Sequence, residues 1–186
     1  DQQLAFWLDF LEGTPTQLNL PTDFQRPPKQ SFKGTTRYFQ IDLSLVERLH
    51  TVAQEQKITA FSIWQSAFSA VLSRYSGDSD IVTGTPVANR RMAEFESLIG
   101  FFVNTVPVRL QGLDTLTFRE LIHHTNETMN QIIANQDLPF ERLLEKIQPE
   151  RDLSRMPLFQ VLFVLQNHEF ETISDSTLSV QSTEVA

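Results

Sequence analysis

Cysteine is absent from the sequence, and the six glycines are scattered singly along 186 residues. The first absence excludes disulfide bonds, zinc–thiolate centres, iron–sulfur clusters and a cysteine nucleophile. The second excludes the glycine-rich loops that bind nucleotide phosphates. Basic residues are also few, because 15 Lys and Arg stand against 23 Asp and Glu, a formal charge of −8. With no basic cluster, the chain has no electrostatic means of holding a nucleic-acid backbone, so we expect no nucleic-acid partner.

Long hydrophobic runs are missing as well. The longest apolar run is far shorter than a membrane-spanning helix, and no signal peptide is visible, so we expect a soluble, cytoplasmic protein without membrane contact. Apolar residues still make up 40% of the chain, and 15 residues are phenylalanine, which is enough for a hydrophobic core. Because the first residue is Asp1 rather than methionine, we expect a segment of a longer polypeptide.

Hydrophobic periodicity divides the chain into three parts. Residues 1–36 are expected to form a helix over Leu4–Leu11, which Gly13 ends, and then a proline-rich extended connector. Residues 37–168 are expected to form the main subdomain. Residues 169–186 are polar with a weak alternation, which predicts a terminal strand or the start of a linker to another domain.

Strand and helix patterns alternate within the main part. The pattern predicts strands over Arg37–Ile41, Ile81–Val87, Phe101–Leu110 and Leu158–Leu165. Pro107 favours an edge or a bulge for the third of these strands. The last is almost continuously apolar, which is typical of a central strand covered on both faces. We therefore predict an α/β fold, a layered sandwich with a mixed sheet and flanking helices.

The helix starts are indicated by their capping residues. Ser44 with Glu47 and Thr117 with Glu120 each fit a capping box, in which two side chains satisfy free backbone N–H groups. Thr59 is expected to cap the helix between them, and a shorter helix, Phe140–Ile147, is expected after Pro139. The stripe expected to be buried on the helix after Thr59 is Phe61, Trp64, Phe68, Val71, Leu72 and Tyr75.

Two adjacent histidines, His123 and His124, are the first candidates for a base or a metal ligand. Helical geometry places both away from the centre of their helix's apolar stripe, which favours solvent exposure. Glu127 lies one turn from His123, but no third ligand is obvious, so we expect no metal site.

A polar pair, Asn104 and Thr105, interrupts an apolar strand. A buried Asn lowers stability unless its amide finds hydrogen-bond partners. A satisfied structural amide and a functional amide are both open interpretations of Asn104.

Two further polar stretches precede apolar segments. In Asn135–Glu141, Asp137 is interpreted as the cap of the helix after Pro139. In Arg151–Phe159, two arginines and Asp152 precede the last strand, and an ion pair that holds the entrance of this strand is the favoured interpretation.

Taken in this order, the three stretches resemble the condensation domains of nonribosomal peptide synthetases, which belong to the chloramphenicol-acetyltransferase-like superfamily. The family's later signatures read approximately Ile-Gly-x-Phe-Val-Asn-Thr followed by Arg, then His/Asn-Gln-Asp-x-Pro-Phe-Glu, then Arg-Asp-x-Ser-Arg-x-Pro-Leu-Phe. The matching residues are Ile99–Thr105 with Arg109, Asn135–Glu141, Arg151–Phe159, Gly84–Arg90 and the opening Gln2–Trp7. The resemblance thus covers nearly the whole chain.

The family's catalytic signature, His-His-x-x-x-Asp-Gly, is not matched. His123-His124 is followed at the corresponding offsets by Thr128 and Met129, and it lies after the Asn-Thr motif rather than before it. The resemblance therefore implies the C-terminal half of a condensation domain, part of an acyltransferase that is inactive alone. No catalytic residue is expected in this chain.

The resemblance also implies a setting for the motif residues. In the family, two similar halves enclose a tunnel in which the amine of a carrier-bound acceptor attacks the thioester of a carrier-bound donor. It implies a substrate-binding role for Asn104. The residues that it implies for the motif framework, the half-domain interface and the tunnel wall are Gly100, Thr105, Arg109, Gln136, Asp137, Arg151, Asp152 and Arg155.

The partners follow from the same resemblance. They are the N-terminal half of the domain, peptidyl and aminoacyl carrier domains, and an adjacent adenylation domain. No cofactor is expected to bind directly, and phosphopantetheine is expected on the carriers. Two alternatives stay open: a non-catalytic carrier-binding module, and half of a coenzyme A-dependent acyltransferase. The latter predicts a cationic surface for nucleotide phosphates, which this acidic sequence does not show.

Overall fold

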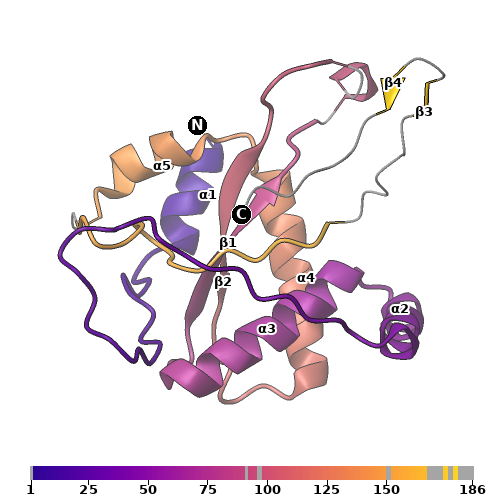
Figure 1. Ribbon diagram of the computed structural model, residues 1–186, viewed down its shortest axis with the longest axis horizontal. Helices are drawn as coiled ribbons and strands as arrows, with labels where there is room; N and C mark the ends of the chain where they lie inside the picture. Colours follow the sequence, from indigo (N-terminus) through magenta and orange to yellow (C-terminus); the bar gives the residue numbers. More distant parts are fainter. Residues whose placement is uncertain are drawn as a thin grey trace.

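The computed structural model describes residues 2–90, 92–95, 98–149, 152–166, 174–175 and 178–179. In chain order its elements are α1 (Gln2–Phe10), α2 (Leu43–Gln56), α3 (Ala60–Ser76), β1 (Ile81–Val87), the 3-10 turn η1 (Ala93–Phe95), β2 (Asn104–Leu110), α4 (Phe118–Ala134), α5 (Phe140–Ile147), β3 (Ser174–Asp175) and β4 (Leu178–Ser179) (Figure 1). Of the segment 169–186, only the paired β3 and β4 are described. The rest of that expected strand or linker lies outside the described residues.

The central sheet of the described structure has two antiparallel strands, and the parallel pairing of the predicted mixed sheet is limited to one isolated bridge. β1 and β2 pair antiparallel without a bulge, from Ile81 opposite Leu110 to Val87 opposite Asn104. On the other side of β1, residues 161–163 form a parallel bridge, in which the Gly84 N–H donates to the Val161 carbonyl and the Phe163 N–H donates to the Gly84 carbonyl, each at 2.9 Å. Within the described residues β2 is an outer strand, so Pro107 marks an edge.

Helices cover both faces of this sheet. In Figure 1, α1 and α5 lie on one side of β1 and β2, and α3 and α4 lie on the other. Side chains from β1, β2, α1, α4 and α5 form the main core, together with Leu158 and Phe159. Trp7 of α1 is only 1% exposed, so α1 belongs to this core although the connector separates it from the other elements. No helix among the described residues is long and apolar enough to cross a membrane.

Gly84 allows the segment after Leu158 to approach β1. A methyl group on Gly84 would overlap the ring of Phe159, with its carbon 2.6 Å from Cζ. We therefore expect Gly84→Ala to lower the free energy of unfolding by about 1–2 kcal/mol, because the ring must move out of a packed core. Urea denaturation measures the change. The matched control is Gly34→Ala, where no atom lies within 4 Å of the added carbon; equal losses in both variants would contradict this account of Gly84.

Of the four helix caps expected from the sequence, those of α3 and α4 are confirmed. The Thr59 side chain accepts a hydrogen bond from the Ser62 N–H, and Thr117 forms the full capping box with Glu120. Hydrogen bonds from Thr117, first from its side chain and then from its backbone, lower the pKa of Glu120. The cap of α2 was assigned to the wrong residue, since α2 begins at Leu43.

Asp42 caps α2 in place of Ser44. Its carboxylate accepts the Ser44 N–H at 2.7 Å, and its hydrogen bonds with Ser44 lower its pKa. Both residue types are good caps. Asp42 takes the N-cap position because it is the last non-helical residue, whereas Ser44 already lies within the first turn of α2.

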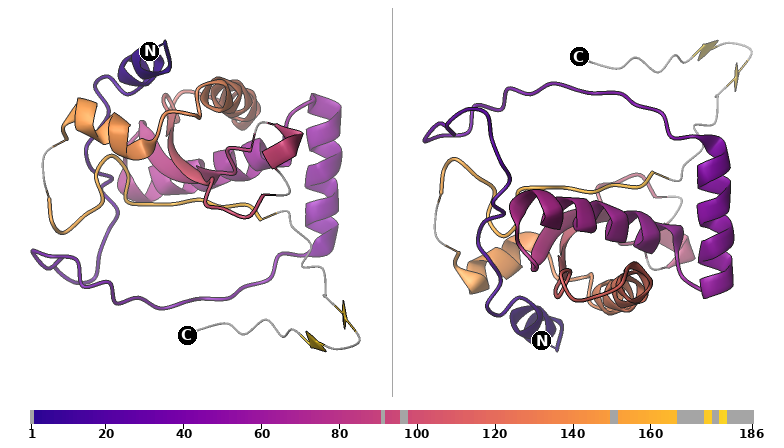
Figure 2. Two further views of the ribbon diagram at one scale, coloured as in Figure 1. Left: turned by 90° about the horizontal axis from the view of Figure 1, so that it is seen from above. Right: turned by 90° about the horizontal axis from the view of Figure 1, so that it is seen from below.

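The expected strand over Arg37–Ile41 does not form. These residues have no regular structure, and the Phe39 side chain is 82% exposed. Figure 2 shows the connector from α1 to α2 as an extended segment outside the helices and the sheet. It is held at intervals, for example where the Gln30 N–H donates to the Leu153 carbonyl at 3.0 Å. A strand needs a hydrogen-bonding neighbour, and no described segment pairs with residues 37–41.

The segment Leu158–Leu165 was predicted as a central strand covered on both faces, and this is wrong for the described structure. Leu158 and Phe159 are buried, but Leu162 and Val164 are 52% and 50% exposed. Only the isolated bridge to Gly84 gives this segment strand character. The reason is the same as for residues 37–41, because no described strand pairs with its second edge. The strand expected from Phe101 similarly begins only at Asn104.

The buried face of α3 is not the aromatic stripe that the sequence predicts. Val71 and Tyr75 are exposed, and only Leu72 of the six expected residues is buried. The residues actually buried are Ser62, Ile63, Gln65, Ser66, Ser69 and Leu72. Small polar side chains let α3 approach α4 closely, and Ser66 Oγ bonds Thr125 Oγ1 at 2.8 Å. Gln65 Nε2 also donates to Thr83 Oγ1 of β1 at 2.9 Å, so much of this polar face is satisfied internally.

Candidate functional site

Asn104 lies at the start of β2 and binds the turn between α4 and α5. Its Nδ2 donates to the carbonyls of Gln136 and Leu138, each at 2.8 Å. Its Oδ1 accepts the N–H groups of Thr105, at 3.0 Å, and Phe140, at 3.2 Å. An amide side chain offers two donors and two acceptor positions, so all four are in use. The side chain thereby joins β2 to residues 135–140, which we call the corner.

Helix α1 holds the corner from a second direction. Gln3 Nε2 donates to Asp137 Oδ2 at 2.8 Å, and Gln3 Oε1 accepts the Leu138 N–H at 3.0 Å. Trp7 Nε1 donates to the Asn135 carbonyl at 2.9 Å. The corner is therefore fixed by side chains from two elements that are far apart in the sequence.

Asp137 does not cap α5, contrary to the interpretation from the sequence. The N-cap position is Pro139, which makes no side-chain cap bond. The Phe140 N–H, one of the free donors at the helix start, bonds Asn104 Oδ1 instead. The acceptor thus comes from a strand 36 residues earlier, and the Asp137 carboxylate bonds Gln3.

Phe140 brings the three stretches that carry the resemblance together. Its backbone bonds Asn104, and its ring lies 5.3 Å from the ring of Phe159, centroid to centroid. Phe159 in turn packs against Gly84. The first, second and third stretches therefore meet at one helix start.

Arg109 is buried at the opposite end of β2 and holds the end of α1. Its side chain is 7% exposed and forms an ion pair with Asp80, with Nη2 2.7 Å from Oδ2. Nη1 donates to the carbonyls of Phe10, at 3.0 Å, and Glu12, at 2.7 Å. The guanidinium thus neutralises one carboxylate and satisfies carbonyls left free at the α1 C-terminus. Arg109 has a structural role in this arrangement.

The third stretch forms a tight turn beside a groove. Asp152 Oδ1 accepts the Ser154 N–H at 2.7 Å, and Asp152 Oδ2 lies 3.6 Å from Arg155 Nε. Hydrogen bonds from Ser154 are the main cause that lowers the pKa of Asp152, and the charges of Arg155 and Arg26 add to it. The expected ion pair is therefore present for Arg155, whereas Arg151 lies outside the described residues.

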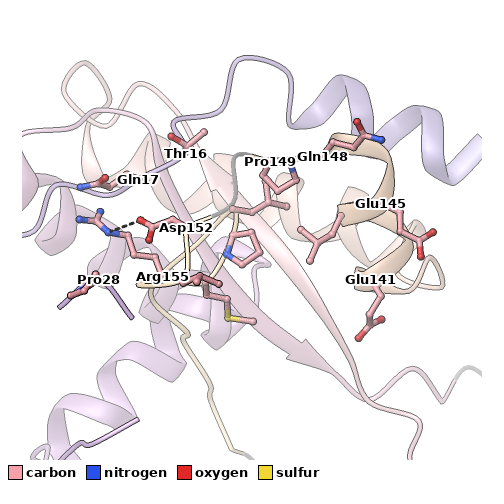
Figure 3. Close-up of a pocket in the computed structure, with 14 residues that line it drawn as sticks. Thr16, Gln17, Pro28, Glu141, Glu145, Gln148, Pro149, Asp152 and Arg155 are labelled. Carbon is pink, nitrogen blue, oxygen red and sulfur yellow. Dashed lines mark ion pairs between the residues drawn. The ribbon is translucent and has the colours of Figure 1, made fainter. Parts of the chain in front are cut away.

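The groove has a volume of about 1280 Å³ and separates this turn from α5. Figure 3 shows Glu141 and Glu145 of α5 on one side, and the Asp152–Arg155 pair on the other. Carboxylates outnumber cations among these lining side chains. An anionic ligand would be repelled at the α5 wall.

Gly100 lies on the approach to β2, and Thr105 is the second residue of that strand. Gly100 is exposed, and a carbon added to it would lie 2.9 Å from the ring of Phe102. The guanidinium of Arg90 stacks over that ring at 4.4 Å and donates to the Leu98 carbonyl. Thr105 contributes its backbone N–H to Asn104. Arg90 and Phe102 thus pack within the segment that leads into Asn104.

The histidines do not form a metal centre in the described structure. His123 and His124 are half-buried rather than exposed, and His123 Nε2 lies 3.2 Å from Gln56 Oε1 of α2. No group of three or more His, Asp or Glu side chains is placed to hold a metal among the residues that the structure describes. His123 therefore belongs to the contact between α2 and α4.

Gln3 and Trp7 were not predicted from the sequence as residues of this site. The sequence indicated them only indirectly, because both lie in the opening segment that resembles condensation domains. Neither has a local pattern that indicates a bond to the corner, which lies 128 or more residues away in the chain.

A family model described as Condensation domain matches residues 1–186. The chain belongs to this family. The condensation-domain sequence is 44% identical over 162 residues to tyrocidine synthase 3 of Brevibacillus parabrevis, which covers 87% of the chain and 2% of that protein. It is 41% identical over all 186 residues to malpibaldin synthetase of Mortierella alpina, 3% of whose length is covered. The resemblance to nonribosomal peptide synthetase condensation domains is thereby confirmed.

Solved structures agree with this assignment. The condensation-domain chain superposes on a four-domain nonribosomal peptide synthetase bound to AMP and glycine with a TM-score of 0.88 and 29% identity, over 91% of this chain and 13% of that chain. The X-domain from teicoplanin biosynthesis gives a TM-score of 0.80 at 28% identity, over 87% and 36% of the two chains. The predicted α/β class is confirmed. The chain spans only about 2–4% of the length of the curated relatives that it matches.

Proposed function

We propose that these residues form the C-terminal part of a condensation domain that joins carrier-bound aminoacyl or peptidyl groups through an amide bond. The observation that carries the proposal is the meeting of three family stretches at Phe140, in a chain that the family model matches throughout. The His-His-x-x-x-Asp-Gly signature is absent from these residues. The reactive imidazole would therefore come from an N-terminal half, and this part would supply tunnel wall and carrier-docking surface.

In this proposal the described residues orient the substrates and take no direct part in the reaction. Holding two thioester-linked substrates in line supplies much of the rate of such a reaction, and it requires a rigid wall. The corner meets this need, because Asn104 and Gln3 fix its backbone. Substrate binding by Asn104 stays a prediction, and direct contact through its amide would have to replace one of its four hydrogen bonds. Gln136 contributes its carbonyl to Asn104.

The proposed partners are the N-terminal half, the donor and acceptor carrier domains with their phosphopantetheine arms, and an adenylation domain. A cytoplasmic location is part of the same proposal. Half of a coenzyme A-dependent acyltransferase is the less favoured alternative, since Glu141 and Glu145 line the groove and disfavour nucleotide phosphates there.

An amide-formation assay with loaded carriers tests the proposal. We expect no product from the 186 residues alone, and product when an N-terminal half is supplied with them or in the complete natural polypeptide. Intact mass spectrometry of the acceptor carrier detects the transfer. Carrier binding without any transfer in the complete polypeptide would favour the non-catalytic carrier-binding module. Amide formation by the isolated chain would refute the proposal that the reactive imidazole comes from an N-terminal half.

A further inference from the structure

Leu138 is bonded at both of its backbone groups by side chains from different elements. Its N–H donates to Gln3 Oε1 of α1 at 3.0 Å, and its carbonyl accepts from Asn104 Nδ2 of β2 at 2.8 Å. The same two side chains also bond residues within two positions of Leu138, since Gln3 bonds Asp137 and Asn104 bonds Gln136 and Phe140. A shift of Leu138 toward or away from α1 would thus alter the partners of Asn104.

We propose that Gln3 is a positioning residue, which sets the place of the corner and through it the orientation of Asn104. Gln3 makes two hydrogen bonds of opposite sense, donating to the Asp137 carboxylate and accepting from the Leu138 N–H. The Gln3 amide does both at once without carrying a charge, because its donor and its acceptor are different atoms. Trp7, one turn further along α1, adds a bond from a fully buried ring to the Asn135 carbonyl, which orients α1 against the corner. The inference rests on the proposed function where it concerns the reaction.

The two partners permit a reciprocal exchange as the test. Gln3→Glu places a second carboxylate against Asp137 and removes the donor between them. Asp137→Asn alone leaves an acceptor for Gln3 Nε2. In the double variant, the amide introduced at position 137 donates to the carboxylate introduced at position 3, whose second oxygen still accepts the Leu138 N–H. The exchange therefore restores the bond between positions 3 and 137 with donor and acceptor interchanged, and it keeps the bond from the Leu138 N–H. Gln2→Glu, on the exposed neighbouring position of α1, is the control for the added charge.

Two measurements on the complete natural polypeptide distinguish a positioning role of Gln3 from a role in packing alone. Hydrogen exchange over residues 135–143 reports the corner directly. The second readout is kcat, the rate of amide formation at saturating carrier, together with KM, the carrier concentration that gives half of this rate. A lower kcat at an unchanged KM reports a loss of positioning. We expect Gln3→Glu to speed exchange at the corner and to lower kcat about tenfold with KM little changed, as for the loss of one orienting hydrogen bond. The double variant should recover most of both, and Gln2→Glu should change neither.

The outcomes discriminate between this inference and the proposed function. Failure of the unmodified complete polypeptide to form amide refutes the proposed function, and the exchange data alone then decide whether Gln3 holds the corner. Unchanged exchange and kcat in Gln3→Glu refute the inference. Loss without recovery in the double variant also refutes it, because a general packing defect would not respond to the exchange of donor and acceptor.

Discussion

Replacement of Arg109 by methionine is expected to lower the free energy of unfolding by about 3–5 kcal/mol. The substitution keeps most of the buried stem but removes the guanidinium. Asp80 then loses its ion-pair partner, and the carbonyls of Phe10 and Glu12 lose their donor. Removal of one partner from a buried pair leaves an uncompensated charge, which is far more costly than the pair itself is stabilising.

Urea denaturation monitored by tryptophan fluorescence measures this loss, since Trp7 lies on the helix that Arg109 holds. The matched control is Arg74→Met on the exposed surface of α3, which should change stability by less than about 0.5 kcal/mol. If both arginine variants unfold at the same urea concentration, Arg109 does not hold α1 to the sheet in solution.

Replacement of Asn104 by aspartate is expected to lower the free energy of unfolding by about 2–3 kcal/mol, although it replaces only one side-chain atom. Oδ1 still accepts the Phe140 and Thr105 N–H groups. The second oxygen, however, faces the carbonyls of Gln136 and Leu138, to which the amide of Asn104 donates. Two donor–acceptor contacts become contacts between acceptors, and this loss is independent of any substrate.

The matched control is Asn130→Asp on the exposed face of α4, where the same exchange should change stability by less than about 0.5 kcal/mol. Thermal and urea unfolding of both variants, together with hydrogen exchange at the start of α5, provide the comparison. An Asn104→Asp variant as stable as the unmodified chain would mean that the amide is available to a substrate, in line with the role that the resemblance implies.

The local features were predictable because their causes lie within a few residues. Thr59 and Thr117 cap their helices through groups three positions away, and Gly77 ends α3 with the positive φ that glycine adopts freely. The motif stretches were likewise recognisable as sequence. The cap of α2 shows the limit of such local rules. Two suitable capping residues, Asp42 and Ser44, lie two positions apart, and local rules alone did not choose between them.

Composition, hydrophobic periodicity and motif order were enough to predict an α/β condensation-domain chain, since each depends on residue identity or on near neighbours in the sequence. The tertiary structure decided which face of α3 is buried, which segments found a pairing strand, and that Asn104 bonds the corner rather than standing free. These features depend on elements that lie tens of residues apart. Gln3 and Leu138 are 135 positions apart, and only the packed fold brings the side chain of one to the backbone of the other.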